Sequence, residues 1–135
     1  MKDMKVEKEE AIRAGRRALD SLYRVQQELN SAKNWGLVDL FGGGGLISLI
    51  KHTKISSASS LCYQARRDLE DFERELKDVL FLDRNLDVNI GALLTFLDFF
   101  SDDVFSDFLV QRRINQARKN VEDAINTVRG ILERL

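Results

Sequence analysis

Four consecutive glycines, Gly42 to Gly45, precede a run that carries Lys51 and His52, and this combination could bind a phosphate group. A glycine-rich loop leading into a helix can surround an anion with backbone N–H groups, while a lysine reaches its oxygens. The P-loop spacing is not met, because five residues separate Gly45 from Lys51. The dinucleotide pattern G-x-G-x-x-G also fails, because position 47 is isoleucine. An anion or nucleotide site at Gly42–Gly45 is therefore a minor alternative.

The segment Trp35–Ile50 also has features of a peripheral membrane contact. It combines Trp35 and Phe41 with small residues and a basic flank, as amphipathic interfacial segments do. The same apolar residues are also needed to begin a packed helix. A buried corner is therefore the main interpretation, and a membrane surface is the alternative.

An acidic cluster near a second helix start consists of Asp98, Asp102, Asp103 and Asp107. Carboxylates bind hard cations, but this spacing is not that of an EF-hand, and acidic residues also stabilise a helix N-terminus. His52 is the only histidine and Cys62 the only cysteine, and neither has the neighbours of a metal site or an activated nucleophile. We predict no catalytic residue, no metal and no cofactor, and hence no enzyme.

Amphipathic helices must position these residues. Apolar residues at alternating spacings of three and four define a seam at Ile55, Ala58, Cys62, Ala65, Leu69, Phe72, Leu76 and Val79. A second seam consists of Val110, Ile114, Ala117, Val121, Ala124, Val128, Ile131 and Leu135. The first helix is less regular: its seam is Ile12, Gly15, Leu19, Leu22, Gln26 and Leu29, with Ala11, Ala18, Val25 and Ala32 beside it. These patterns predict long helices over 4–33, 46–82 and 105–135, and a short apolar helix over 91–100.

The 135 residues, 44% hydrophobic and without proline, are predicted to form one all-α domain. The expected architecture is an antiparallel bundle of three long helices with coiled-coil-like seams, plus the short apolar helix as a plug. Six phenylalanines around the last connection are expected in its core: Phe81, Phe96, Phe99, Phe100, Phe105 and Phe108.

Two corners of the chain repeat one design at an offset of 59 residues, so that Asp39 matches Asp98 and Phe41 matches Phe100. The candidate interaction residues of the first corner are Trp35, Asp39, Phe41, Gly42, Gly43, Gly44, Gly45, Lys51 and His52. Those of the second corner are Asp98, Phe105, Asp107, Phe108 and Gln111.

The two corners, "NWGLVDLFGGGGLISLIKHTKI" and "DFFSDDVFSDFLVQRRINQA", resemble a group of uncharacterised bacterial proteins. In that group a Trp-Gly-x-x-Asp element leads into a glycine run and a Lys-His pair. A later Phe-x-Asp-Phe/Trp-x-Val-Gln element opens the last helix. The resemblance spans most of the chain and implies a small helical protein with no known activity. It also implies that a specific function would lie at the corners.

The net charge of −1, with both signs interspersed, offers no field to attract nucleic acid, and no nucleic-acid partner is expected. A single cysteine and a charged N-terminal segment predict a cytoplasmic protein. Apolar residues beside the seams could contact a second subunit: Ala11, Ala18, Val25, Ala32, Ile125 and Leu132. We therefore predict a non-enzymatic helical interaction or scaffold protein that self-associates or binds a helical partner.

Overall fold

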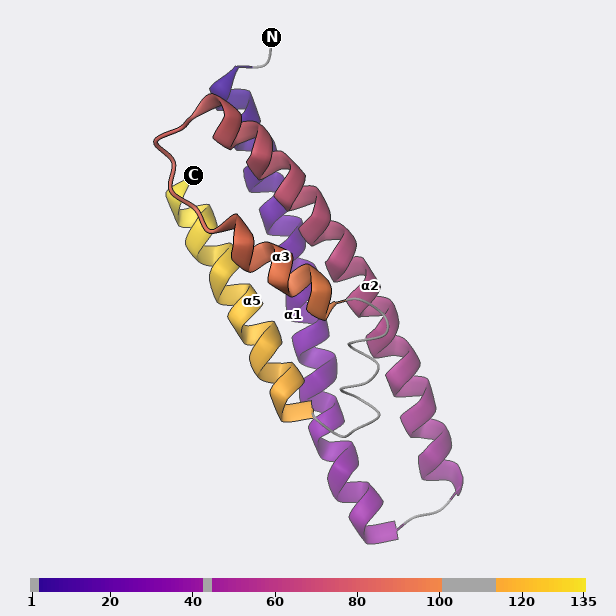
Figure 1. Ribbon diagram of the computed structural model, residues 1–135. Helices are drawn as coiled ribbons and strands as arrows, with labels where there is room; N and C mark the ends of the chain where they lie inside the picture. Colours follow the sequence, from indigo (N-terminus) through magenta and orange to yellow (C-terminus); the bar gives the residue numbers. More distant parts are fainter. Residues whose placement is uncertain (1–2, 43–44, 101–113) are drawn as a thin grey trace.

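The computed structural model describes residues 3–42, 45–100 and 114–135, with side chains for residues 3–30, 60–100 and 115–135. Four helices account for most of them: α1 (Met4–Gly42), α2 (Gly45–Leu82), α3 (Ile90–Phe99) and α5 (Ile114–Arg134) (Figure 1). These described segments contain no strand, which confirms the all-α prediction.

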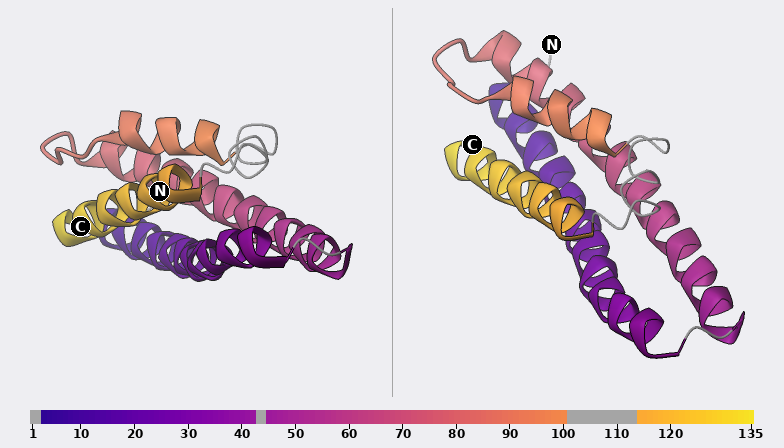
Figure 2. Two further views of the ribbon diagram at one scale, coloured as in Figure 1. Left: turned by 90° about the horizontal axis from the view of Figure 1, so that it is seen from below. Right: turned by 60° about the horizontal axis from the view of Figure 1, so that its bottom comes forward.

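The helices α1 and α2 form a long antiparallel pair, and the other two helices pack on it (Figure 1). α5 contacts α1 and runs antiparallel to it. α3 contacts α2 and α5 and lies on the far side of them from α1 (Figure 2). No close backbone approach joins α2 to α5 in the described parts of the two helices. α1 and α3 therefore bridge them from opposite sides of the core.

The seam predicted for α2 is confirmed from residue 62 onward. Its six described positions are buried: Cys62, Ala65, Leu69, Phe72, Leu76 and Val79. Side chains at alternating spacings of three and four share one face of a helix, so burying that face against α1 and α3 requires all six. The α2 seam thus sets how the rest of the bundle packs.

The seam predicted for the first helix is confirmed at Gly15, Leu22 and Leu29, which are buried, and is wrong at its other three positions. The deepest row on α1 is Ala11, Ala14, Ala18, Leu22, Val25 and Leu29. Ile12, Leu19 and Gln26 are only partly buried and flank that row. The physical reason is that α1 packs on both α2 and α5, so its small residues take the central position where the helices approach closely.

The residues beside the predicted seams are also covered within the chain. Ala11, Ala18 and Val25 are fully buried, Ile125 is nearly so, and Leu132 packs against the core. These residues therefore do not form the free stripe that was expected to contact a second subunit. The side chain of Ala32 lies outside the described part.

The first corner differs from its prediction. The first helix was expected to end near residue 33, but α1 continues to Gly42, and α2 already begins at Gly45. Trp35–Ile50 is therefore helical backbone on both sides of residues 43–44 rather than a long loop. Without proline, Gly36 is the only strong helix breaker between residue 33 and Gly42, and one internal glycine costs only about 1 kcal/mol.

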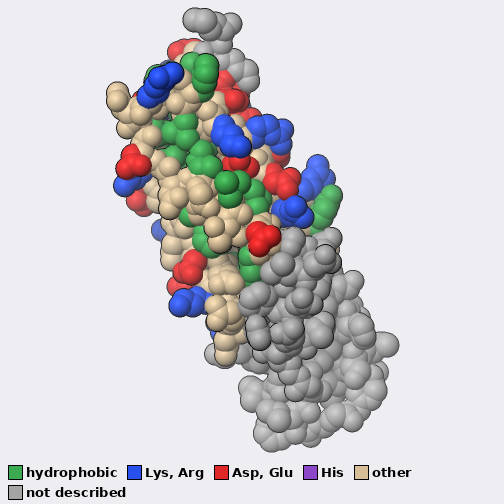
Figure 3. Space-filling view, viewed as in Figure 1, with side chains coloured by type: hydrophobic (Ala, Val, Ile, Leu, Met, Phe, Trp, Pro, Cys, Tyr) green, Lys and Arg blue, Asp and Glu red, His purple; other side chains and the backbone are tan. Residues whose placement is uncertain are grey.

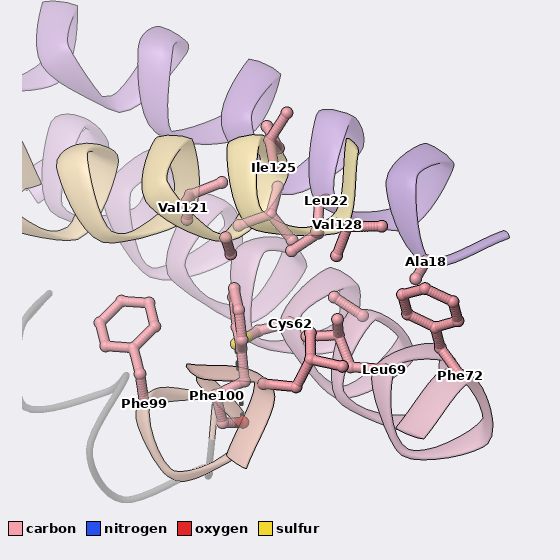
Figure 4. Packing of buried hydrophobic residues seen from close by; sticks show 14 of the residues in the cluster. Ala18, Leu22, Cys62, Leu69, Phe72, Phe99, Phe100, Val121, Ile125 and Val128 are labelled. Atoms are coloured by element: carbon pink, nitrogen blue, oxygen red, sulfur yellow. Dashed lines mark hydrogen bonds between the residues drawn. The ribbon is translucent and has the colours of Figure 1, made fainter. Parts of the chain in front are cut away.

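α3 and its C-terminal cap place two of the expected phenylalanines in the core. Phe100, the residue that caps the C-terminus of α3, is fully buried and points into the core beside Cys62, and Phe99 is nearly buried at its side (Figure 4). The two rings meet edge to face at 5.0 Å between centroids. Phe96 is half-buried, as a residue at the edge of this core would be. Phe81, by contrast, is 79% exposed, so its predicted place in the core is wrong.

Candidate functional site

The predicted first corner is split between two helix ends. Trp35, Asp39, Phe41 and Gly42 lie on the last part of α1, and Gly45, Lys51 and His52 lie on the first part of α2. The backbone brings these two segments to the same end of the α1–α2 pair (Figure 1). Gly43 and Gly44, and the side chains of the five other residues that are not glycine, lie outside the described part of the chain.

The predicted second corner is represented by one residue. Asp98 lies on α3 and is exposed to solvent. Phe105, Asp107, Phe108 and Gln111 lie outside the described residues. The assignment of function to the two corners thus stays a prediction.

The opposite end of the α1–α2 pair carries exposed hydrophobic side chains. We call this surface the Phe81 end and define it by Met4 and Val6, at the start of α1, and Phe81 and Leu82, at the end of α2. Phe81 is the most exposed of the large hydrophobic residues described. Isolated exposed hydrophobic residues are ordinary, but four at one end of a helix pair form a candidate contact surface.

The register of the helix pair holds this surface together. Ser21 on α1 bonds Asp68 on α2, and Gly15 lies against Phe72. Continuing this antiparallel register to the end of the pair brings Val6 level with Leu82. The ion pair between Lys8 Nζ and Asp83 Oδ2, at 3.2 Å, closes the same end.

Three carboxylates meet beside the Phe81 end. Oxygens of Glu7, Glu10 and Glu75 lie within 4.8 Å of one another, and Glu7 is only 1% exposed. Three carboxylates from two helices could serve as ligands of a hard divalent cation. None of the three is without a partner, however, and an acidic cluster alone does not define a metal centre. We assign no metal to it.

Shallow grooves lie elsewhere on the described surface, and two of them border the start of α3 and the middle of α2. One, of about 340 Å³, separates α5 from the start of α3, and Arg134 Nη1 donates to the Asp87 carbonyl at its wall, at 2.8 Å. The other, of about 280 Å³, lies between α1 and α2 and is lined by Arg17, Asp20, Ser21, Arg24, Gln64 and Asp68. Neither groove contains a histidine or cysteine among its lining residues, so neither offers an assembled nucleophile and base.

Charged side chains of both signs are scattered over the described half of the surface in Figure 3. No strongly basic or acidic field dominates that half, which agrees with the net charge of −1. Within the helices that the structure describes, none has an apolar run long enough to cross a membrane.

No family model, curated protein or solved structure matches this chain. The resemblance to a bacterial helical family, which its corner motifs suggest, therefore stays a prediction.

Sequence reasoning missed the Phe81 end, although the signal was present in the helical phase. Phe81 follows the last seam residue, Val79, by two positions. Two residues turn a helix by about 200°, so Phe81 must lie opposite the buried face if the helix reaches it. The expected burial of Phe81 followed from its aromatic character and not from this helical phase, and it was wrong.

Proposed function

We propose that this chain is a non-enzymatic interaction protein of the helical-scaffold type, and that the Phe81 end is its contact surface. The observation that supports the proposal is the 79% exposure of Phe81, at the end of the helix pair that also carries three further exposed hydrophobic residues. Aromatic side chains are enriched at the centres of protein interfaces, and burying one stabilises a complex by about 2 kcal/mol. The predicted cytoplasmic location and the bacterial resemblance are part of the same proposal.

The packing of the helices supports a scaffold role. The α1–α2 pair is held by a continuous core of small and large apolar residues and by polar contacts at Ser21 and Lys8. A rigid pair of this kind fixes the position of a surface at its end. A partner can then bind without first ordering the residues that it contacts.

A matched pair of variants tests the proposal. Wild type, Phe81→Ser and Tyr63→Ser are used as affinity baits, and each recovered protein is identified and its binding repeated with purified components. Tyr63 is 52% exposed on the same helix but away from the Phe81 end, which makes it the control. We expect at least one partner, which can be another copy of the chain, to bind the wild type and Tyr63→Ser but not Phe81→Ser. Identical partners for all three baits would rule out this surface.

The two alternatives at the first corner remain weaker. α2 begins at Gly45, so a helix N-terminus does follow the glycine run, but a helix N-terminus alone does not make an anion site. The membrane alternative rests on the composition of Trp35–Ile50. No observation on the described side chains favours either one.

A further inference from the structure

Two charged residues flank Phe81 symmetrically along the chain. Asp78 precedes it by three residues and Arg84 follows it by three, and both are exposed. Neither makes an ion pair within the described part of the protein. Neighbouring charges are paired: Lys77 with Glu73 at 2.6 Å, and Lys8 with Asp83 at 3.2 Å. The pattern around Phe81 is therefore one negative and one positive charge, each available to a partner, on either side of an exposed ring.

We infer that the Phe81 end is an isologous interface between two copies of this chain, an inference that rests on the proposed function. In a two-fold contact, if residue i of one copy meets residue j of the other, then j also meets i. A two-fold axis through Phe81 that sets the two chain segments antiparallel pairs Asp78, on α2, with Arg84 of the other copy, which lies in the turn after α2. The chain supplies both halves of the charge complementarity itself.

The same arrangement places apolar residues at the centre and charges at the rim. The Phe81 rings meet at the axis, and Val6 and Leu82 are exposed at the same end of the helix pair. Such a contact is smaller than a standard protein–protein interface, so it belongs to the weak, concentration-dependent class. The charge pairs at its rim set the register of the two copies more than they set its strength.

Molar mass measured by light scattering and by sedimentation, over roughly 1 μM to 1 mM chain, tests the inference in a range where weak dimers dissociate. We expect the mass to rise from 15.5 kDa towards twice that value. Phe81→Ser should raise the dissociation constant roughly 30-fold, as truncation of a central aromatic residue does. Tyr63→Ser should leave it unchanged. Circular dichroism checks that each variant is folded, which is expected because both side chains are exposed.

Charge reversal tests the two-fold pairing itself. Asp78→Arg places like charges opposite Arg84, and Arg84→Asp places like charges opposite Asp78, so each variant alone should dimerise more weakly than wild type. The double variant Asp78→Arg/Arg84→Asp restores opposite charges and should recover the dimer. An equimolar mixture of the two single variants should form a heterodimer, because every rim pair is then attractive.

If the wild-type chain stays monomeric up to about 1 mM, its self-association is weaker than almost any specific complex. That result would overturn the inference. So would a dimer that is indifferent to both single charge reversals. The proposed function is judged separately, by the affinity baits. If the chain is monomeric but Phe81→Ser abolishes binding of a different protein, the Phe81 end is still a contact surface. Its occupant is then that protein and not a second copy of the chain.

Discussion

Leu132 closes over the backbone of Gly15: a Cβ atom added at Gly15 would lie only 2.6 Å from Leu132 Cδ2. The same added atom would lie 2.9 Å from Cε1 of Phe72. Phe72 belongs to α2 and Leu132 to α5, two helices whose described backbones do not approach each other closely. Gly15 is thus the point at which side chains from both helices reach α1, and its missing side chain makes room for them.

Gly15→Ala is expected to destabilise the protein. Leu132 is partly buried and can turn aside, but Phe72 is fully buried and cannot move without disturbing the core. Overpacking of this kind costs about 1–3 kcal/mol, which exceeds the gain of about 1 kcal/mol from replacing a helical glycine. Thermal and urea unfolding should show a lower Tm and a lower midpoint, with a change of roughly 4 °C for each 1 kcal/mol.

Gly130→Ala is the matched prediction with the opposite sign. Gly130 lies within α5, is exposed, and has nothing within 4 Å of an added Cβ atom. Alanine therefore differs from glycine here only in its higher helix propensity, and the free energy of unfolding should rise by up to about 1 kcal/mol. If Gly15→Ala raised the unfolding midpoint, as Gly130→Ala is expected to do, the close packing assigned to Gly15 would be wrong.

The contrast between α1 and α2 explains how much of the fold the sequence could predict. Large residues at regular spacings mark the α2 seam, so its buried face and its C-terminal end at Leu82 were predictable. In the first half of α1 the alanines Ala11, Ala14 and Ala18 run beside the larger Ile12 and Leu19. Hydrophobicity alone favours burying the larger residues, whereas the close approach of neighbouring helices there selects the alanines. That approach is a tertiary property and leaves no periodic signal.

The candidate site was less predictable for a related reason. The corner motifs around Trp35 and Asp98 attract attention because their composition is unusual, whereas exposure depends on helix phase and on what packs nearby. Phe81 and Phe100 are the same residue type near two ends of one connection. Phe81, at the end of α2, is exposed to solvent. Phe100 fills the core because the chain turns back after α2 and α3 packs against it. Composition could not separate these two cases.

Ser21→Ala is expected to lower stability by about 1 kcal/mol. Ser21 is nearly buried, and its hydroxyl donates to the Asp68 carboxylate across the α1–α2 interface. Gln64 Nε2 donates to the other carboxylate oxygen at 3.2 Å and would remain. Chemical denaturation of the variant measures the loss. Asp68→Asn keeps an acceptor and should lose less than Asp68→Ala; equal losses would mean that the hydrogen bond does not stabilise the pair.

The membrane alternative makes a prediction that conflicts with the proposed function. If the Phe81 end is the contact surface, the wild-type chain should stay in the supernatant after sedimentation with vesicles of anionic phospholipid. Interfacial segments bind through buried apolar area and charge, so a true membrane contact would be lost with Trp35→Ser or Phe41→Ser. Vesicle binding that shows this loss would transfer the function to Trp35–Ile50.

The thiol of Cys62 reports on whether α3 stays closed. Cys62 is 2% exposed, and its Sγ lies 3.7 Å from the Phe100 carbonyl, to which it donates (Figure 4). A thiol reagent can reach it only when α3 or the whole bundle opens. A local opening free energy of about 3 kcal/mol would slow labelling roughly 100-fold relative to an exposed thiol. Phe100→Leu leaves a small cavity and should speed labelling without unfolding the chain.

Leu94→Ala supplies the control for this prediction. Leu94 lies on α3 as well but is 49% exposed, so its removal costs little packing and should leave the labelling rate of Cys62 unchanged. Global unfolding is separated from local opening by urea, since labelling through local opening depends only weakly on denaturant. Wild-type labelling as fast as that of an exposed cysteine would contradict the placement of Phe100 over Cys62, because a closed α3 leaves the reagent no path to the sulfur.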